Sequence, residues 1–118
     1  MIAVAHERTT GPVPGRIAAL NDELRRNGRG GRVVVTAGVA SLPETERVAI
    51  IAAVRTFSAF DADNDSHGEH DFGVVEVGRV RCFWKIDAYD RDLRFGLPDP
   101  ADPAVTIRVL TIMLAEEY

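Results

Sequence analysis

Residues 72–87 read FGVVEVGRVRCFWKID and decide the fold of this chain. Two runs rich in valine, aromatic and other strand-forming residues, 72–77 and 80–87, are separated only by Gly78 and Arg79. A Gly-X pair between such runs is typical of a β-hairpin with a type II′ turn, because glycine accepts the positive φ that this turn requires. The sequence therefore predicts two antiparallel strands joined by a two-residue turn.

The register of this hairpin is tested by its own side chains. If Val77 faces Val80, then Gly73 faces Trp84, and the missing glycine side chain leaves room for the indole. The same register pairs Glu76 with Arg81, Val75 with Cys82 and Val74 with Phe83. One face of the hairpin is then predicted to lie on the core, and it consists of Val75, Val77, Val80, Cys82, Trp84 and Ile86.

The chain before the hairpin predicts a helix, a strand and a second helix. Apolar residues recur at helical spacing over residues 15–27, and Gly28 is the expected stop. Three consecutive valines predict a buried strand over residues 32–36, followed by a short loop. Residues 42–59 are predicted to form a central helix. Ser41 and Glu44 match a capping box at the start of this helix.

The chain after the hairpin predicts a final helix over residues 102–117. Asp102 and Pro103 suit the N-cap and first position, and Val105, Val109, Ile112 and Met113 follow at helical spacing. The many β-branched residues leave a strand as the alternative. The predicted fold is thus α+β in the order α-β-α-β-β-α, with a small three-stranded sheet whose hairpin packs against about three helices.

The length and composition are those of one globular domain. The 118 residues are 46% hydrophobic and 27% charged, with a net charge of −4, which argues against a general nucleic-acid binder. Residues 1–14 lack periodicity and are predicted to be a flexible arm, so that residues 15–118 form a single α+β domain. The single Cys82 excludes an internal disulfide and a multi-cysteine zinc site. We expect a cytoplasmic protein without membrane contact, because no apolar run approaches the ~20 residues of a membrane span.

One polar loop stands out, residues 61–71, which read DADNDSHGEHD. It holds five carboxylates and two imidazoles in eleven residues and contains no lysine or arginine. These groups repel one another unless something neutralises them. One interpretation is a calcium loop of the EF-hand kind, with Asp61, Asp63 and Asp65 at the first, third and fifth ligand positions. That pattern lacks the required glycine at Ser66 and the bidentate glutamate at Phe72.

A second interpretation is a transition-metal or hydrolytic site. His67, His70 and Asp71 supply the nitrogen and oxygen ligands that zinc, nickel or manganese prefer. Extending the hairpin register places His70 opposite Asp87, with Lys85 on the same face as Asp87. His70, Asp87 and Lys85 are therefore the candidate catalytic groups of a metal-dependent hydrolase or nuclease.

A third interpretation is purely structural. Asp and Asn side chains accept hydrogen bonds from nearby backbone N–H groups and so stabilise turns. Gly68 and Gly73 also favour tight turns. The loop would then be scaffolding that holds its own shape.

Four stretches resemble the bacterial domain-of-unknown-function family 3768: GRVVVTAGVA at 31–40, DNDSHGEHDFG at 63–73, FWKIDAYD at 83–90 and PDPADPAVTIRVLTIMLAEEY at 98–118. The resemblance covers residues 16–118. Two positions depart from the family pattern, because that of Ser66 is usually proline and that of Ala88 is often aromatic. The resemblance implies little chemistry. It implies an association with mobile genetic elements, where such proteins occur near counter-defence genes.

These observations favour a small non-enzymatic binding protein that covers a surface of a macromolecular partner. In its concrete form it is a counter-defence inhibitor of the anti-CRISPR or antirestriction type, and its partner is a protein such as a nuclease effector complex. Nucleic acid is not the expected direct ligand, and no cofactor is expected unless the loop holds a divalent metal. A homodimer formed through exposed sheet edges is a further expectation. The expected binding surface consists of Asp61, Asp63, Asp65, Glu69, Tyr89 and Asp90.

Overall fold

The hairpin forms with the register that the sequence predicts. In the computed structural model, which describes residues 15–91 and 99–118, strand β3 (Phe72–Val77) pairs antiparallel with strand β4 (Val80–Asp90). Every predicted pair is present, including Gly73 opposite Trp84. Gly78 has a φ of 61° and Arg79 lies outside the positive region, as a type II′ turn requires. The predicted arm, residues 1–14, lies outside the described residues.

The last part of the chain is a strand, which corrects the helix predicted over residues 102–117. Strand β5 (Thr106–Leu114) runs antiparallel to β4, and only a short 3-10 helix, η2 (Ala115–Glu117), follows it. Alternate residues of β5 face the interior, namely Thr106, Arg108, Leu110 and Ile112. Because the first two are polar, the two-residue period of this strand is concealed in the sequence.

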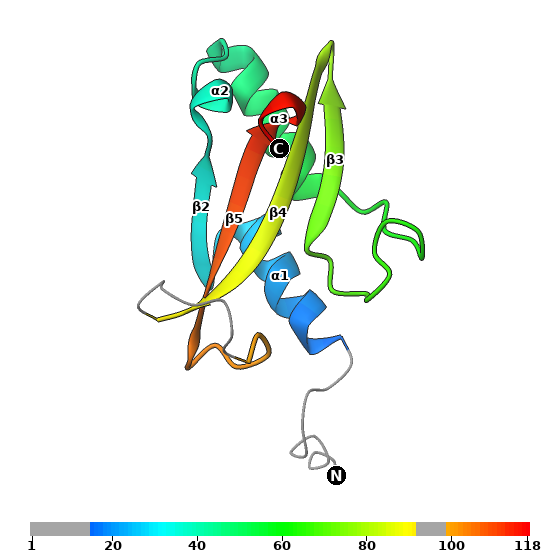
Figure 1. Ribbon diagram of the computed structural model, residues 1–118. Coiled ribbons are helices and arrows are strands. Elements are labelled where there is room, and N and C mark those ends of the chain that lie inside the picture. The colour runs from blue at the N-terminus through cyan, green and yellow to red at the C-terminus, as the bar shows by residue number, and fades with distance from the viewer. Residues whose placement is uncertain (1–14, 92–98) are drawn as a thin grey trace.

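Within residues 15–91 and 99–118 the sheet has four strands rather than the predicted three. Strand β2 (Gly31–Val35) pairs parallel with β5, and the order across the sheet is β2-β5-β4-β3 (Figure 1). β2 was predicted to be buried, but it lies at the edge of the sheet with a neighbour on one side only. Val33 and Val34 are therefore 46% and 42% exposed.

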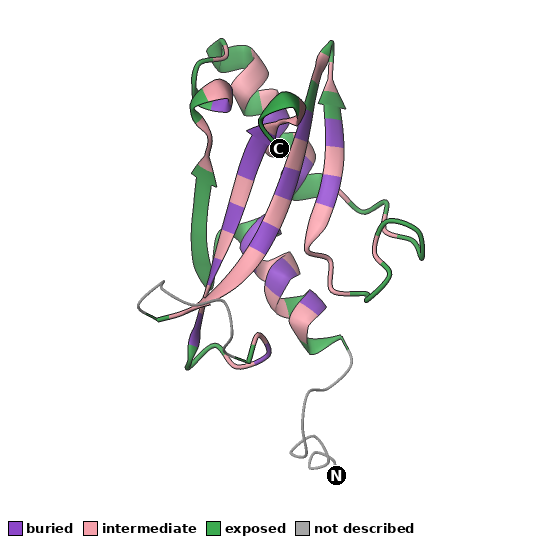
Figure 2. Cartoon of the chain, viewed as in Figure 1, coloured by how far each residue is buried: buried purple, intermediate pink, exposed green. Residues whose placement is uncertain are grey.

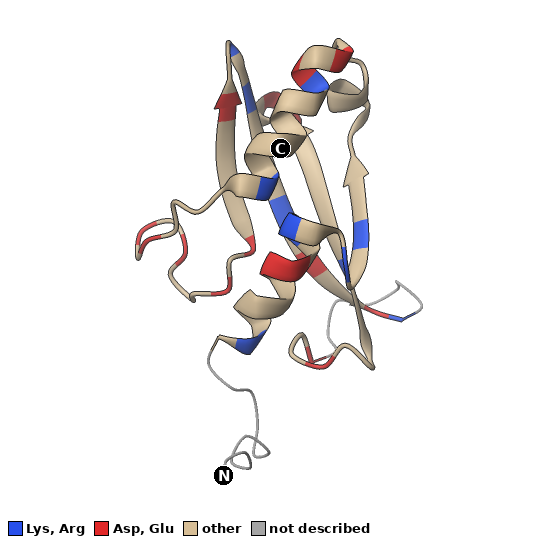
Figure 3. Cartoon of the chain, turned by 180° about the vertical axis from the view of Figure 1, so that it is seen from behind, with Lys and Arg blue, Asp and Glu red and all other residues tan. Residues whose placement is uncertain are grey.

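Two helices cover one face of this sheet. Helices α1 (Arg16–Asn27) and α3 (Glu44–Thr56) lie on the same side, as the views from both directions show (Figures 1 and 3). α1 ends at Gly28, whose φ of 72° confirms the predicted stop. No helix within the two described ranges is long and apolar enough to cross a membrane.

The start of α3 differs from its prediction. A one-turn helix, α2 (Ala37–Ala40), occupies the expected loop, and the backbone N–H of Ser41 donates to the carbonyl of Ala37 at 3.0 Å. Ser41 is thus the C-cap of α2. Pro43 is the N-cap of α3, so the predicted capping box with Glu44 does not form.

The core lies between the helices and the hairpin face that the sequence singled out (Figure 2). Trp84 and Cys82 are fully buried there, with Val75 and Ile86 beside them, which confirms the predicted face. Burial raises the pKa of the Cys82 thiol, so this cysteine is a packing residue with little thiolate character. The opposite sheet face carries a cluster of aromatic rings from Phe72, Phe83 and Tyr118.

Gly73 offers a direct test of this packing. A Cβ at Gly73 would overlap the indole of Trp84, which is fully buried. Gly73→Ala is therefore expected to lower the free energy of unfolding by about 1–3 kcal/mol, the usual cost of overpacking. Chemical denaturation measures this loss. In a Trp84→Phe background, which frees space at the overlapped indole nitrogen, the cost of Gly73→Ala should fall, and an equal cost in both backgrounds would contradict the packing argument.

Candidate binding site at the acidic loop

The acidic loop, residues 61–71, connects the end of α3 to β3 and projects beside the edge of the sheet (Figures 1 and 3). Its first half is organised by Asp61. One Asp61 carboxylate oxygen accepts hydrogen bonds from the backbone N–H groups of Asp63 at 2.8 Å and Asn64 at 3.0 Å. The Asn64 side chain in turn donates to the carbonyl of Ala59 and accepts from the N–H of Asp61. The predicted calcium ligand Asp61 therefore serves to close a turn.

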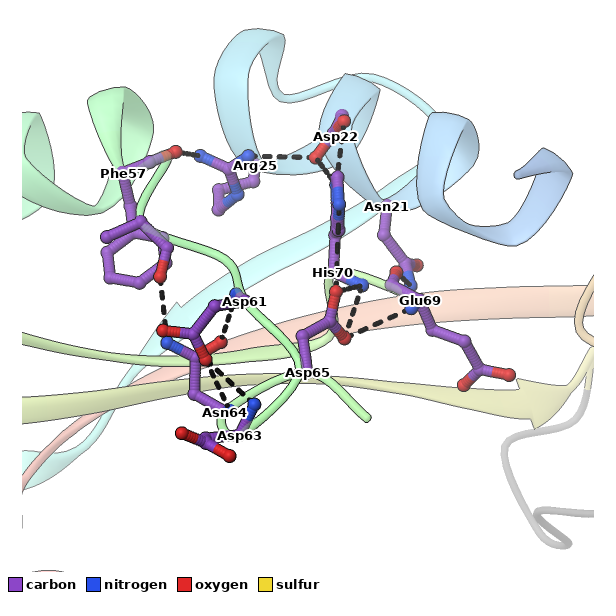
Figure 4. A network of polar contacts seen from close by, with 11 residues as sticks. Asn21, Asp22, Arg25, Phe57, Asp61, Asp63, Asn64, Asp65, Glu69 and His70 are labelled. Carbon is purple, nitrogen blue, oxygen red and sulfur yellow. Dashed lines mark hydrogen bonds and ion pairs between the residues drawn. The ribbon is translucent and has the colours of Figure 1, made fainter. Parts of the chain in front are cut away.

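The second half of the loop is organised by Asp65. Its carboxylate accepts from the backbone N–H groups of Glu69 at 3.1 Å and His70 at 3.2 Å (Figure 4). The Asp65 side chain is only 5% exposed. These bonds confirm the structural interpretation for Asp61 and Asp65, since both carboxylates hold the backbone in shape.

His70 fastens the loop to helix α1. Its ring lies parallel to that of Phe60, with centroids 3.9 Å apart, and its Nδ1 lies 3.0 Å from an Asp22 carboxylate oxygen. The other ring nitrogen lies 3.6 Å from Asp65. His70 has a φ of 55°, which for a residue other than glycine is an uncommon conformation held by its surroundings.

The predicted pairing of His70 with Asp87 is therefore wrong. The ladder between β3 and β4 ends at Phe72, and the positive φ of His70 turns the chain away from β4. Asp87 pairs instead with Lys85, at 3.1 Å. This confirms that Lys85 and Asp87 share a face, and the hydrogen bond to Asp87 raises the pKa of the Lys85 ammonium.

Asp22 extends the anchorage into the core. The carboxylate oxygen that contacts His70 also accepts from a guanidinium nitrogen of Arg25, at 2.8 Å. Arg25 is 1% exposed, and its other terminal nitrogen donates to the carbonyls that end α3, including that of Phe57 at 2.8 Å. The acidic loop, α1 and α3 are thus joined by one chain of polar contacts (Figure 4).

A cavity of about 300 Å³ lies between the second half of the loop, α1 and the end of β4. We call it the β4 pocket. It brings together two residues of the predicted binding surface, Glu69 and Tyr89, with the predicted site residues Asp71 and Asp87. Asp61 and Asp63 lie outside it. Its remaining lining residues are Ile17, Asn21, Ile86, Ala88, Pro100 and Arg108.

The floor of the β4 pocket is built from two buried polar side chains. Arg108 is 3% exposed and its Nε donates to the Asn21 amide oxygen at 2.8 Å, while a terminal nitrogen donates to the carbonyl of Pro100. The Asn21 amide nitrogen donates to the carbonyl of Glu69 at 2.9 Å. Burial lowers the pKa of the Arg108 guanidinium. Sequence reasoning missed both residues, although an arginine at an inward position of a strand is a signal of a polar site.

Asp71 is a carboxyl of the pocket whose pKa is shifted. Burial raises its pKa, and the charges of Asp65 and Asp87 add to the increase. The negative charge of the Asp71 carboxylate is therefore poorly stabilised in the folded protein, and a cationic partner would stabilise it.

This perturbation predicts a pH-dependent effect of Asp71→Asn. The folded-state pKa lies above the ordinary value of 3.8, so the contribution of Asp71 to stability is complete below pH 3.8 and is lost as pH rises through the folded pKa. The variant should therefore match the parent near pH 3 and melt at a higher temperature near pH 8. Thermal unfolding followed by circular dichroism measures the difference. Asp63→Asn, in the exposed part of the same loop, serves as the control, and a Tm advantage that shrinks as pH rises would contradict the assignment.

The metal candidates are not brought together. His67 is exposed, the His70 ring is occupied by Asp22 and Asp65, and Asp71 faces the β4 pocket. Within the described ranges, no three histidine, cysteine or acidic side chains are grouped so that they could hold a metal ion. Asp90, the last residue of β4, lies opposite Thr106 of β5.

Comparison with known proteins gives one match. A family model described as a protein of unknown function, DUF3768, matches residues 35–117. The match begins at the last residue of β2, so helix α1 with Asp22 and Arg25 lies outside it. No curated protein and no solved structure matches the chain.

Proposed function

The chain belongs to the DUF3768 family, and from that premise we propose that it is a small non-enzymatic binding protein that covers a surface of a macromolecular partner. The observation that supports this proposal is the way the acidic loop is held. The carboxylates of Asp61 and Asp65 accept hydrogen bonds from the backbone of the loop, and His70 contacts Asp22 of α1. A pre-organised loop loses little conformational entropy when it binds, which favours docking.

The charge of the loop suggests the chemistry of the partner. The carboxylates of Asp63 and Glu69 accept no hydrogen bond within the described part of the chain, so they are available to a cationic surface. Proteins that handle nucleic acids present such basic surfaces. We therefore keep the counter-defence form of the proposal, in which the loop competes with nucleic acid for the basic channel of a CRISPR or restriction complex.

The stoichiometry of inhibition tests this proposal. The purified chain is titrated into CRISPR effector and restriction nucleases, and DNA cleavage is measured at low and physiological salt. A binding protein is expected to inhibit completely at one chain per complex and to lose potency as salt rises. Absence of inhibition across the panel, or complete inhibition at a small fraction of one chain per complex, contradicts it, since the latter indicates turnover.

Charge reversal identifies the surface involved. The double variant Asp63→Lys and Glu69→Lys is expected to weaken inhibition at least about tenfold, because like charges across an interface repel. Glu44→Lys makes the same kind of change at the exposed start of α3, away from the loop, and should retain inhibition. Equal loss in both would show that only the net charge matters.

A metal-dependent hydrolase using His67, His70 and Asp71 remains the alternative proposal, and only Asp71 lies in a cavity with other acidic groups. Elemental analysis of untagged protein tests it. Stoichiometric metal that is lost in chelator, together with a drop in Tm, would favour this alternative. If the protein holds no stoichiometric metal and its Tm does not change in chelator, a resident metal is excluded.

A further inference from the structure

The β4 pocket lies where strand β4 continues past the end of its neighbour. β3 stops at Phe72, opposite Lys85, whereas β4 runs on to Asp90. Among the described residues, the backbone N–H of Ile86 makes the last hydrogen bond on this side, donating to the carbonyl of Asp71 at 2.8 Å. In an antiparallel strand, alternate residues direct their N–H and C=O groups to the same side. The N–H and C=O of Ala88 therefore point to the side that β3 has left, into the β4 pocket.

An unpaired strand edge is a template for another strand. Peptides that add a strand to such an edge gain affinity from backbone hydrogen bonds and specificity from the pockets that receive alternate side chains. Ala88 lines the β4 pocket together with Tyr89, so the edge and the cavity form one site.

The charges around this edge select the side chain that fits. Glu69, Asp71 and Asp87 contribute three carboxylates to the lining, against the one cation of Arg108. The Arg108 guanidinium is already bonded to Asn21 and Pro100. Lys85 contacts Asp87, whereas no ion pair within the described residues involves Glu69 or Asp71, on which Arg108 and His67 act only through their charges. The pocket is therefore complementary to a cation.

The size of the cavity limits what this cation can be. A volume of about 300 Å³ is at the lower end of the range for small-molecule sites. It suits one long side chain better than a larger ligand. Arginine also offers several donors in a plane, which suits recognition by two carboxylates at once.

We propose that the β4 pocket binds an extended segment of the partner protein, which pairs with the free edge at Ala88 and inserts an arginine side chain between Glu69 and Asp71. This inference rests on the proposed function, because it names the part of the partner that the protein recognises. It places the specific contact at the pocket, while the exposed carboxylates of the loop contribute long-range attraction.

Nuclear magnetic resonance of the full ¹⁵N-labelled chain tests the site directly. The probes are the blocked tripeptides acetyl-Val-Arg-Val-amide and acetyl-Val-citrulline-Val-amide, which differ in the charge of one side chain. The arginine peptide is expected to shift the amide signals of Ala88 and Glu69 and to bind at least about tenfold more tightly than the citrulline peptide. Asp71→Asn should lower the affinity by a similar factor, and Glu44→Gln, at the exposed start of α3, should leave it unchanged.

Three results would overturn the inference. These are shifts that map elsewhere on the chain, equal affinity for the two peptides, and equal sensitivity to Asp71→Asn and Glu44→Gln. Free L-arginine is a further probe, because it lacks the flanking peptide backbone. If it binds as tightly as the arginine peptide, pairing with the strand edge contributes nothing and that part of the inference is wrong. The signals of Asp71→Asn also report whether the variant is folded.

The two proposals fail in different ways. If the peptides do not bind but charge reversal of the loop abolishes nuclease inhibition, the pocket inference is wrong and the proposed function stands. If the arginine peptide binds at Ala88 but no nuclease is inhibited, the pocket is a peptide site and the counter-defence function is wrong.

Discussion

Replacing Arg25 with methionine is expected to lower the free energy of unfolding by about 3–5 kcal/mol, the usual cost of removing one partner of a buried ion pair. Arg25 is 1% exposed, and its guanidinium bonds to Asp22 and to three carbonyls at the end of α3. It also lies over the rings of Phe60 and Trp84. Methionine fills much of the same space but leaves the Asp22 carboxylate and the carbonyls without this donor.

Urea denaturation of matched variants measures the effect. Arg26→Met makes the same substitution at the next, exposed position of α1 and should change stability by less than about 0.5 kcal/mol. Because Arg25 and Asp22 are direct partners, the double variant Arg25→Met and Asp22→Asn should lose less than the two single variants added together. Comparable losses for Arg25→Met and Arg26→Met would mean that the buried network contributes little.

Replacing Trp84 with alanine is expected to cost a similar amount, about 3–5 kcal/mol. The indole is fully buried, contacts the Phe57 ring edge-on at 5.5 Å and fills the space that a side chain at Gly73 would occupy. Alanine cannot fill the volume of the indole, so the substitution leaves a cavity. The Trp84 indole nitrogen has no hydrogen-bond partner in the described part of the chain, and Trp84→Phe should therefore cost much less than Trp84→Ala.

Phe83→Ala is the control on the opposite face of the same strand. Phe83 is half-buried in the aromatic cluster with Phe72 and Tyr118, so its truncation should cost clearly less than that of Trp84. Denaturation followed by far-ultraviolet circular dichroism suits both variants, because it does not depend on tryptophan fluorescence. Equal costs for Phe83→Ala and Trp84→Ala would show that the core is not centred on the helix-covered face.

The hairpin was predictable because its signals are local. A two-residue turn fixes the register, and each cross-strand pair then tests that register independently. Strand β5 was not predictable in the same way. Its inward positions include Thr106 and Arg108, so its apolar residues do not alternate, and those that remain also fit a helix.

The sequence was enough to identify the acidic loop as the candidate site, but not to predict which residues elsewhere in the chain the loop contacts. The sequence indicates that residues 61–71 form a special loop, and it indicates Asx turns as one explanation. It does not indicate that His70 contacts Asp22, since the two are distant in sequence and the positive φ of His70 ends the regular extension of β3.

The parallel pairing of β2 with β5 has a consequence for the kinetics of folding. The pairs β3–β4 and β4–β5 each join strands that follow one another in the chain. In contrast, β2 and β5 are separated in the chain by α2, α3, β3 and β4. Such pairings form slowly because a long loop must close first. We expect β2 to join the sheet last, so the rate-limiting intermediate would leave its valines uncovered and prone to self-association during synthesis.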